Sequence, residues 1–425
     1  MNELISRRRF ALTSGAAIFS ACFSRAFGQG VFHSSGFLLS QTRNKPQATV
    51  LSDEFLSRLT EVMKTDAVPG LTAAIIKGGE IVWARGFGVK NVETKEAVTT
   101  ETIFPAASLS KPVFAYAVLK LRDEKLIDID RPLVEYLPWP DLPNDLRAKL
   151  ITARHVLSHS TGLLNWRFQA NQPLTINSTP GQAFTYSGEG IYYLQRVVEH
   201  LTGRGLGELM HERVLKPCGM QHSSYVWQPE YKTQATSIYR ENNQLFVGGL
   251  GPHMYEHVAK LHKPLEKWRY EDVLQIYPEI REKAYPGVRG GFPPLPAFLE
   301  PNAAGSLKTT ATDYARFIIH IMDNARRKKF EITEATRREM LTSQTRINDA
   351  LAWGLGWGLE QAEGRQYFWH WGEHFAFRTL VFGDAKNRSG VVVLSNSGTG
   401  HHACEQIVKQ ATGHDHPAFA FINRG

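Results

Sequence analysis

Residues 104–116, FPAASLSKPVFAY, place a serine, a lysine and a proline within five positions of one another. Beyond the proline, apolar residues recur at helical spacing, which favours a helix with one buried face. Proline is tolerated inside a helix only in its first turn, where its missing N–H would have no partner anyway. We therefore expect Ser108 and Lys111 to lie at the start of this helix, one turn apart and on the same face.

Ser108 and Lys111 in this arrangement can supply the parts of nucleophilic catalysis. A serine hydroxyl is a weak nucleophile until a base takes its proton. Free lysine has a pKa of about 10.4, so it can act as a base near neutral pH only if burial or a nearby positive charge lowers that pKa. The helix start carries partial positive charge, and the amide of Ser108 can form half of an oxyanion hole. A capping serine and a solvated lysine are the plainer alternative.

Strand patterns cluster toward the two ends of the chain, whereas the middle is mostly helical. We therefore expect an α+β fold, in which an antiparallel sheet built from N- and C-terminal segments is flanked by helices. A mostly helical lobe would be inserted at about 125–310, with a site in the groove between sheet and lobe. Within it, an irregular segment at about 252–292 is either a helical insert or a cover over a pocket. Helices are expected at 52–66, 112–126, 152–160, 188–203, 206–215, 312–325 and 401–412, and strands at 71–77, 80–88, 351–360, 365–371, 375–383 and 389–396.

Three further short motifs follow the Ser-x-x-Lys pair along the chain. They are FTYSG at 184–188, AGSL at 304–307 and WHWG at 369–372. Ser-x-x-Lys alone is weak, because roughly one match is expected by chance in a chain of this length. With these motifs in this order, the sequence resembles the serine β-lactamases and penicillin-recognising hydrolases. It is most similar to class C β-lactamases, D-alanyl-D-alanine carboxypeptidases and related esterases, over about 68–396.

The resemblance implies roles for the residues at matching positions. Ser108 would be the nucleophile, and Lys111 and Tyr186 would move protons between the serine and the leaving group. His370 would assist this proton relay or bind a substrate carboxylate. The main-chain N–H of Glu373 would complete the oxyanion hole with that of Ser108. Taken alone, the tyrosine is more often a core or turn residue, and the histidine a strand residue bonded to main chain.

The resemblance also marks substrate-binding positions at Gly188, Gly372 and Arg378. Gly188 departs from the family pattern, in which an asparagine hydrogen-bonds the lysine and a substrate amide carbonyl. Losing one positioned donor commonly lowers a rate by ~10²–10³-fold when that donor acts on the transition state. An ester substrate therefore becomes more plausible than efficient β-lactam or peptide hydrolysis. Arg378 could pair with an acidic substrate group, although a surface arginine is the plainer alternative.

The expected function is that of an exported serine hydrolase acting through an acyl-enzyme. Its substrate would be a small ester, an amide or a D-amino-acid peptide, including peptidoglycan-like molecules. A non-catalytic penicillin-recognising or cell-wall-binding protein of the same fold is the alternative from a different class. No organic cofactor is implied, and no Gly-x-Ser-x-Gly elbow of an α/β-hydrolase is present.

Histidine spacing gives no reason to expect a metal. His370 and His374 share a face of the expected strand but lie roughly 13 Å apart at 3.3 Å per residue, too far for one ion. His155 and His159 could share a helical face, but we interpret them as structural. No His-Glu-x-x-His motif occurs in the chain.

Composition and charge argue against a nucleic-acid partner. The chain has 425 residues, of which 42% are hydrophobic, which is ordinary for a globular protein with a large core or two lobes. The formal net charge is +8, but Arg7, Arg8, Arg9 and Arg25 all lie near the N-terminus. No dense Lys/Arg run is interleaved with aromatic residues, so we expect no nucleic-acid partner.

Residues 1–28 have the pattern of a twin-arginine signal peptide, with SRRRFAL followed by a short apolar run. That run is too short to span a membrane, which takes about 20 apolar residues. We expect cleavage after Gly28, a polar linker at 29–50 and the hydrolase domain at 51–425, in the periplasm or secreted. A disordered basic tail is the alternative.

Three cysteines remain to be placed. Cys22 ends an imperfect lipoprotein cleavage site, so a lipid-anchored form is a further alternative and the one membrane association expected. Cys218 and Cys404 are far apart in sequence and indicate neither a disulfide framework nor a metal site. We expect both to be buried and inert.

Overall fold

The computed structural model describes residues 51–142, 144–168, 172–246, 251–282, 296–322 and 331–423. The expected signal peptide, the linker at 29–50 and Cys22 lie outside these residues, as does the 283–292 end of the irregular insert. None of the helices in the described ranges is both long enough and apolar enough to cross a membrane.

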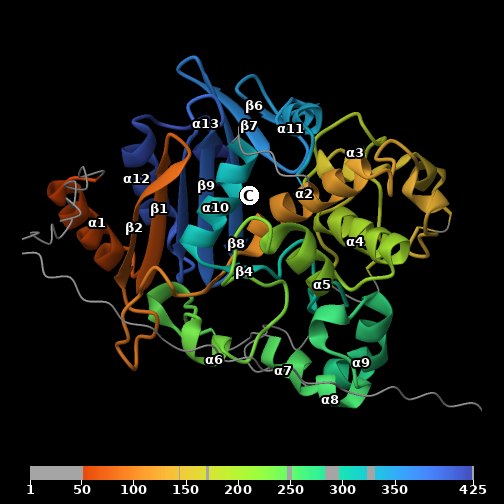
Figure 1. Ribbon diagram of the computed structural model, residues 1–425, viewed down its shortest axis with the longest axis horizontal. Coiled ribbons are helices and arrows are strands. Elements are labelled where there is room, and N and C mark those ends of the chain that lie inside the picture. Colours follow the sequence, from red (N-terminus) through yellow and green to blue (C-terminus); the bar gives the residue numbers. More distant parts are fainter. Residues whose placement is uncertain are drawn as a thin grey trace, which may run out of the picture. The chain divides into compact units, whose positions relative to one another are not determined.

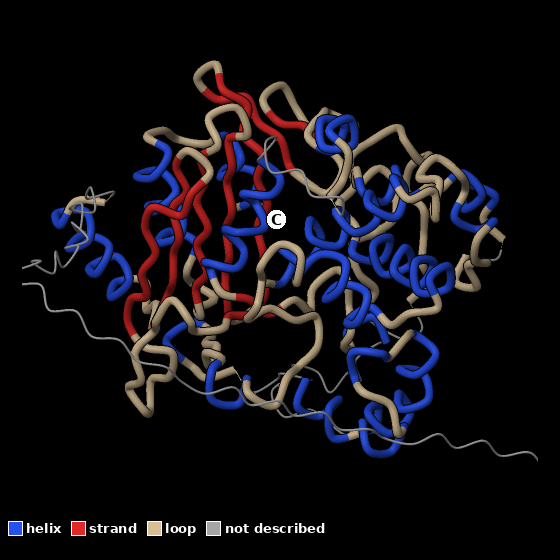
Figure 2. Tube along the Cα trace, in the orientation of Figure 1, coloured by secondary structure: helices blue, strands red, loops and turns tan. Residues whose placement is uncertain are grey.

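An eight-stranded antiparallel sheet organises the fold (Figures 1 and 2). Its strand order is β2-β1-β10-β9-β8-β7-β6-β5, so two strands from the N-terminal part lie beside six from the C-terminal part. The strands are β1 (Gly70–Lys77), β2 (Glu80–Gly88), β5 (Thr345–Arg346), β6 (Leu351–Trp353), β7 (Gly358–Ala362), β8 (Arg365–His374), β9 (Phe377–Asp384) and β10 (Ser389–Ser395). The sheet expected from the two ends of the chain is confirmed.

Strand β1 joins the two ends because both of its faces are apolar. It pairs with β2 around a Gly78–Gly79 turn, and on its other side with β10, where Leu71 lies opposite Ser395. Successive side chains of a strand point to opposite faces. Ala74 accordingly belongs to one buried cluster and Ile75 to another, so β1 serves the cores on both sides of the sheet.

Helices cover both faces of the sheet and form the part of the fold beside it (Figure 1). One face carries α1, α12 and α13, and the other carries α10, which shares its buried cluster with α2. The helices are α1 (Asp53–Thr65), α2 (Ser110–Asp123), α3 (Ala153–Leu157), α4 (Gly188–Thr202), α5 (Leu206–Met210), α6 (Tyr231–Gln234), α7 (Gly251–Glu256), α8 (Val258–Leu261), α9 (Tyr270–Glu282), α10 (Ala311–Met322), α11 (Glu334–Met340), α12 (His401–Thr412) and α13 (Pro417–Ile422). The α+β class with mostly helical structure between the two groups of strands is confirmed.

One expected strand is wrong in its extent. The pattern at 351–360 predicts a single strand, but the chain forms β6 and β7 with a turn between them. Gly356 in that turn has a φ of 89°, which favours glycine, and its N–H donates to Leu157 O at 2.8 Å. A Cβ on Gly356 would lie 2.4 Å from the Cβ of Ala115 in α2, so the turn packs directly against this helix.

Candidate active site

Ser108 lies in a tight 3₁₀ turn, Ala107–Leu109, that leads directly into α2. Ala107 has a φ of 45°, a backbone conformation that non-glycine residues adopt rarely and that persists only where the surroundings hold it. Ser110 Oγ holds this turn by donating to Ala107 O at 2.6 Å and accepting from Leu307 N at 3.0 Å. The turn leaves Ser108 partly exposed while its neighbours on both sides are buried.

Lys111 is the buried partner of Ser108. Its side chain points toward the serine, with Nζ 2.8 Å from Ser108 Oγ and 2.9 Å from Ala304 O in the AGSL motif. Only 1% of Lys111 is exposed, and this burial lowers its pKa to about 7. A substantial fraction of the amine is therefore unprotonated at neutral pH and can accept the serine proton.

Tyr186 lies just before α4, and its side chain approaches Lys111 from the helical part of the fold. The centroid of its ring is 5.0 Å from Lys111 Nζ. Its hydroxyl is buried, and its contacts with the described residues do not meet the geometry of a hydrogen bond. Burial raises the pKa of the phenol well above its usual value, and the interaction with Ser108 offsets only part of this rise. Tyr186 is therefore a neutral hydroxyl near the nucleophile and its base.

His159 packs against the ring of Tyr186 and hydrogen-bonds its two neighbours in the chain. The sequence pattern around His159 did not indicate this position. The helix α3 ends at Leu157, and His159 follows it with a φ of 51°, so it does not share a helical face with His155. Its main-chain O accepts from Thr185 N at 2.6 Å, and its Nδ1 accepts from Ser187 N at 3.2 Å. The two rings, of His159 and Tyr186, lie 4.2 Å apart. The histidine thus binds the residues on both sides of the tyrosine.

Replacing His159 tests this positioning role. Because Nδ1 accepts the Ser187 N–H, His159→Ala should let Tyr186 shift and lower kcat by roughly 10–100-fold with little change in KM. His159→Asn keeps an acceptor near the same place and should recover part of the loss. Steady-state kinetics on a small ester and the melting temperature of each variant provide the measurement. Equal losses in the two variants would contradict the hydrogen-bond contribution.

His370 approaches the cluster from β8. It is fully buried, and its Nδ1 lies 2.7 Å from Trp371 O, so Nδ1 carries the proton and donates it to the carbonyl. Nε2 is then an acceptor, and it has no partner among the described residues. Burial, with a smaller contribution from Lys111, lowers the pKa of His370 to about 3. A neutral ring offers no charge to a substrate carboxylate, and the two expected roles of His370 stay predictions.

Gly372 lets β8 pass close to the nucleophile turn. A Cβ at this position would lie 2.3 Å from Ala106 O and 2.2 Å from Thr379 Oγ1, so only glycine fits. At Gly372, β8 therefore packs against the segment that precedes Ser108, and Glu373 is the next residue of the strand. The two main-chain N–H groups expected to form an oxyanion hole, of Ser108 and Glu373, belong to these neighbouring segments.

A family model described as Beta-lactamase matches residues 55–411. The chain belongs to the beta-lactamase family. Penicillin-binding protein 4* of Bacillus subtilis (strain 168) is 22% identical over 364 residues, which cover 80% of this chain and 71% of that protein. Esterase EstB of Burkholderia gladioli is 27% identical over 197 residues, which cover 39% of this chain and about half, 49%, of the esterase. The resemblance found in the sequence is confirmed.

Solved structures of the beta-lactamase family agree in fold. An octameric penicillin-binding protein homologue from Pyrococcus abyssi has a TM-score of 0.63 at 20% identity, covering 85% of this chain and 77% of that one. A beta-lactamase/D-alanine carboxypeptidase from Pseudomonas syringae has a TM-score of 0.63 at 15% identity, covering 86% and 99%. At these identities the similarity shows the fold alone.

Gly188, at which the resemblance implies an asparagine in the family, begins α4. Its N–H donates to Asn165 Oδ1 at 2.9 Å and to Asn165 O at 3.0 Å. A Cβ on Gly188 would lie only 2.0 Å from Cζ2 of Trp166. The indole ring thus fills the space in which a side chain at 188 would begin. Trp166 is a further residue at the site that the sequence analysis did not single out.

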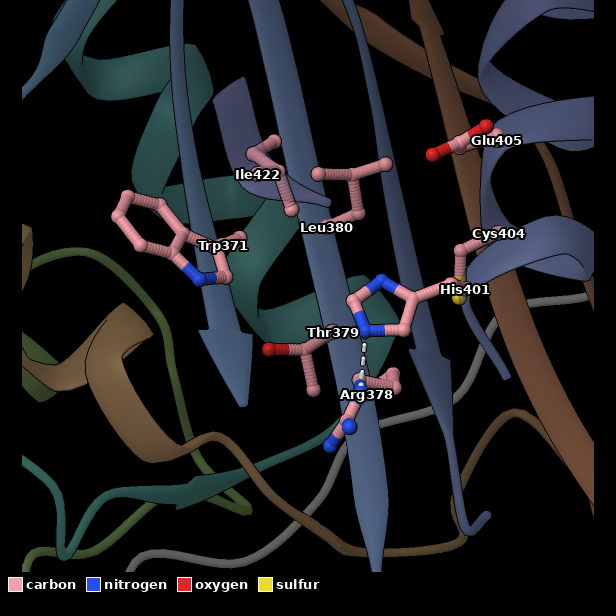
Figure 3. Close-up of a pocket in the computed structure, with 8 residues that line it drawn as sticks. All are labelled: Trp371, Arg378, Thr379, Leu380, His401, Cys404, Glu405 and Ile422. Carbon is pink, nitrogen blue, oxygen red and sulfur yellow. Dashed lines mark hydrogen bonds between the residues drawn. The ribbon is translucent and has the colours of Figure 1, made fainter. Parts of the chain in front are cut away.

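Arg378 is engaged by the protein itself. Its Nη2 lies 2.9 Å from Glu373 Oε1 across the β8–β9 pair, and its guanidinium also donates to His374 O and His401 Nε2. It lines a small pocket whose lining residues do not include Ser108 or Lys111 (Figure 3). The others lining it are Trp371, Thr379, Leu380, His401, Cys404, Glu405 and Ile422. Its expected role toward an acidic substrate group stays a prediction.

The two described cysteines do not belong to this site. Cys218 and Cys404 are buried and unpaired, and burial raises the pKa of both thiols to about 12. No group of three or more His, Cys, Asp or Glu side chains in the described ranges lies close enough together to hold a metal ion.

Proposed function

We propose that this member of the beta-lactamase family is a serine hydrolase that cleaves small esters through an acyl-enzyme. The observation that carries the proposal is the 2.8 Å contact between the buried amine of Lys111 and the partly exposed hydroxyl of Ser108. A nucleophile within hydrogen-bond reach of a base of suitable pKa is the arrangement that acyl transfer requires.

In the proposed reaction, Ser108 Oγ attacks the ester carbonyl carbon while Lys111 Nζ takes its proton. The carbonyl oxygen becomes an oxyanion, stabilised by the main-chain N–H groups of Ser108 and Glu373. The C–O bond to the alcohol then breaks, and the proton passes from Lys111 through the Tyr186 hydroxyl to the departing oxygen. Water, deprotonated by the same groups, hydrolyses the acyl-serine. Nε2 of His370, which has no partner among the described residues, is available as a hydrogen-bond acceptor for this relay.

An ester is favoured over an amide or a β-lactam because of what stands at 188. Amide nitrogen is a poorer leaving group than an ester oxygen and depends more on positioned donors. Gly188 has no side-chain donor, and Trp166 occupies the space of one. Both an esterase and a penicillin-binding protein occur among the relatives of this chain, so the relatives alone do not decide between these substrates.

A substrate panel tests this proposal. We expect hydrolysis of p-nitrophenyl acetate and butyrate, and kcat/KM for nitrocefin and D-alanyl peptides at least roughly 100-fold lower, the size of one lost oxyanion-type donor. Initial rates under identical conditions provide the measurement. Activity on none of these compounds would favour the non-catalytic cell-wall-binding alternative, and comparable activity on nitrocefin would contradict the ester preference.

We further propose that the protein is exported to the periplasm or secreted, with residues 1–28 as a twin-arginine signal. The support is the SRRRFAL motif followed by a short apolar run. A lipid anchor at Cys22 is the alternative form. N-terminal sequencing of the exported protein distinguishes a start at Gln29 from one at a blocked Cys22, and an intact Met1 would contradict export by this signal.

A further inference from the structure

Three aromatic side chains lie together at the start of α4. Trp166 and Phe298 have ring centroids 5.5 Å apart, and Phe168 stacks on Phe298 at 6.0 Å. Phe168 is 61% exposed, and the other two are partly exposed. Leaving a large aromatic ring in water forgoes the stabilisation that its burial would give, and clustered exposed apolar groups commonly mark binding sites.

The loop that carries Trp166 and Phe168 is firmly attached beside Tyr186. Arg167, between the two aromatic residues, donates from Nε to Glu189 Oε1 at 3.0 Å, and its main-chain N donates to the same oxygen at 2.9 Å. Glu189 is buried in the first turn of α4, three positions after Tyr186. The rings of Trp166 and Phe168 therefore flank a residue that is anchored to α4, and a ligand would meet a largely preorganised surface there.

Phe298 connects the aromatic cluster to Lys111 through a short series of hydrogen bonds. It ends a short 3₁₀ turn, Pro296–Phe298, whose Ala297 O accepts from Asn302 Nδ2. Asn302 Oδ1 accepts from Ala304 N at 2.6 Å, and Ala304 O receives the Lys111 amine at 2.9 Å. The aromatic cluster is thus continuous, through residues 302–304 on one side and 186–189 on the other, with the groups that surround Ser108.

We propose that Trp166, Phe168 and Phe298 form an apolar subsite that binds an aromatic group of the ester substrate. The inference rests on the proposed esterase function and adds a substrate class to it. Its main support is the packing of the Trp166 indole against Gly188, because this contact puts an apolar surface two residues after Tyr186. The aromatic group can belong to the acyl or to the alcohol part of the ester.

Paired substrates separate the two parts of the ester. The first pair, p-nitrophenyl acetate and p-nitrophenyl phenylacetate, differs in the acyl group, and the second, ethyl acetate and benzyl acetate, differs in the alcohol. In at least one pair we expect the protein to prefer the aromatic member, and Trp166→Ala to reduce that preference by roughly 10–100-fold. Phe168→Ala, at an exposed position that carries little risk of unfolding, should reduce it by a smaller factor.

Trp83→Ala is the matched control, because Trp83 is also a partly exposed tryptophan but lies on the edge strand β2, which three other strands separate from β8. It should leave the preference unchanged. An unchanged preference in both Trp166→Ala and Phe168→Ala, with Ser108-dependent hydrolysis of acetate esters intact, would overturn the subsite and leave the proposed function standing.

A binding measurement tests the subsite even if the protein hydrolyses no ester. Saturation-transfer NMR with benzyl alcohol should show binding to the wild-type protein and to Trp83→Ala, and a clear loss of signal for Trp166→Ala. Equal signals from all three proteins would overturn the subsite independently of catalysis.

Discussion

Ser108→Ala is expected to lower kcat/KM for p-nitrophenyl acetate by about 10⁴-fold or more, because it removes the hydroxyl that lies 2.8 Å from Lys111 Nζ and would form the acyl-enzyme. The same variant should lose covalent labelling by a fluorophosphonate probe that labels the wild-type protein. The loss should come without a fall in melting temperature, since Ser108 is partly exposed and its hydroxyl contributes little buried area.

Ser57→Ala is a suitable control for this experiment. Ser57 is exposed on α1, where its Oγ donates to Asp53 O, and it takes no part in the site. Rates and labelling of this variant should match those of the wild-type protein. If Ser108→Ala were labelled as strongly as Ser57→Ala, the nucleophile would be a different residue and the proposed mechanism would be wrong.

The pH dependence of kcat/KM is expected to follow Lys111. Burial lowers the pKa of this amine to about 7, and only the unprotonated form can take the serine proton. Activity should therefore fall about tenfold per pH unit below pH 7 and level off above it. Lys111→Arg keeps a permanent positive charge and should lose most activity at every pH. Rates between pH 5.5 and 8.5 provide the measurement, and a rate still rising steeply at pH 8.5 would contradict the lowered pKa.

The same shift in pKa predicts a change of stability with pH. Between about pH 7 and about pH 10, the unfolded chain binds a proton at Lys111 that the folded protein does not, so stability should rise with pH across this window. Below pH 7 both states are protonated, and the full penalty for burying the charge remains. Lys111→Met should flatten this part of the profile, which melting temperatures at pH 7, 8 and 9 can show.

The parts of the site that could be predicted from the sequence are those encoded in short local patterns. The proline at 112 limits where α2 can begin, and the Ser-x-x-Lys spacing then puts Ser108 and Lys111 on one face. The short strand patterns near both ends predicted the sheet in the same way. Tyr186 and His370 were placed by the order of motifs that the beta-lactamase family shares, which no local periodicity could have supplied.

The features that could not be predicted depend on contacts between irregular segments. Trp166 and Gly188 meet because a loop folds back onto the first turn of α4, and no periodic pattern joins the two positions. His159 adopts left-handed backbone beyond the end of α3, so its helical pattern gave the wrong direction for its side chain. The turn that separates β6 from β7 likewise arises from the close packing of Gly356 against α2.

The pairing of Leu71 in β1 with Ser395 in β10 has a consequence for synthesis and folding. The first strands made by the ribosome have no central neighbour until nearly the whole polypeptide has emerged, so the core that supports Ser108 closes late. Such distant pairing slows folding, because the entropy of a very long loop is lost before the contacts form. A chain that stops short of Val391 would lack not an accessory tail but most of β10, the central strand with which β1 pairs.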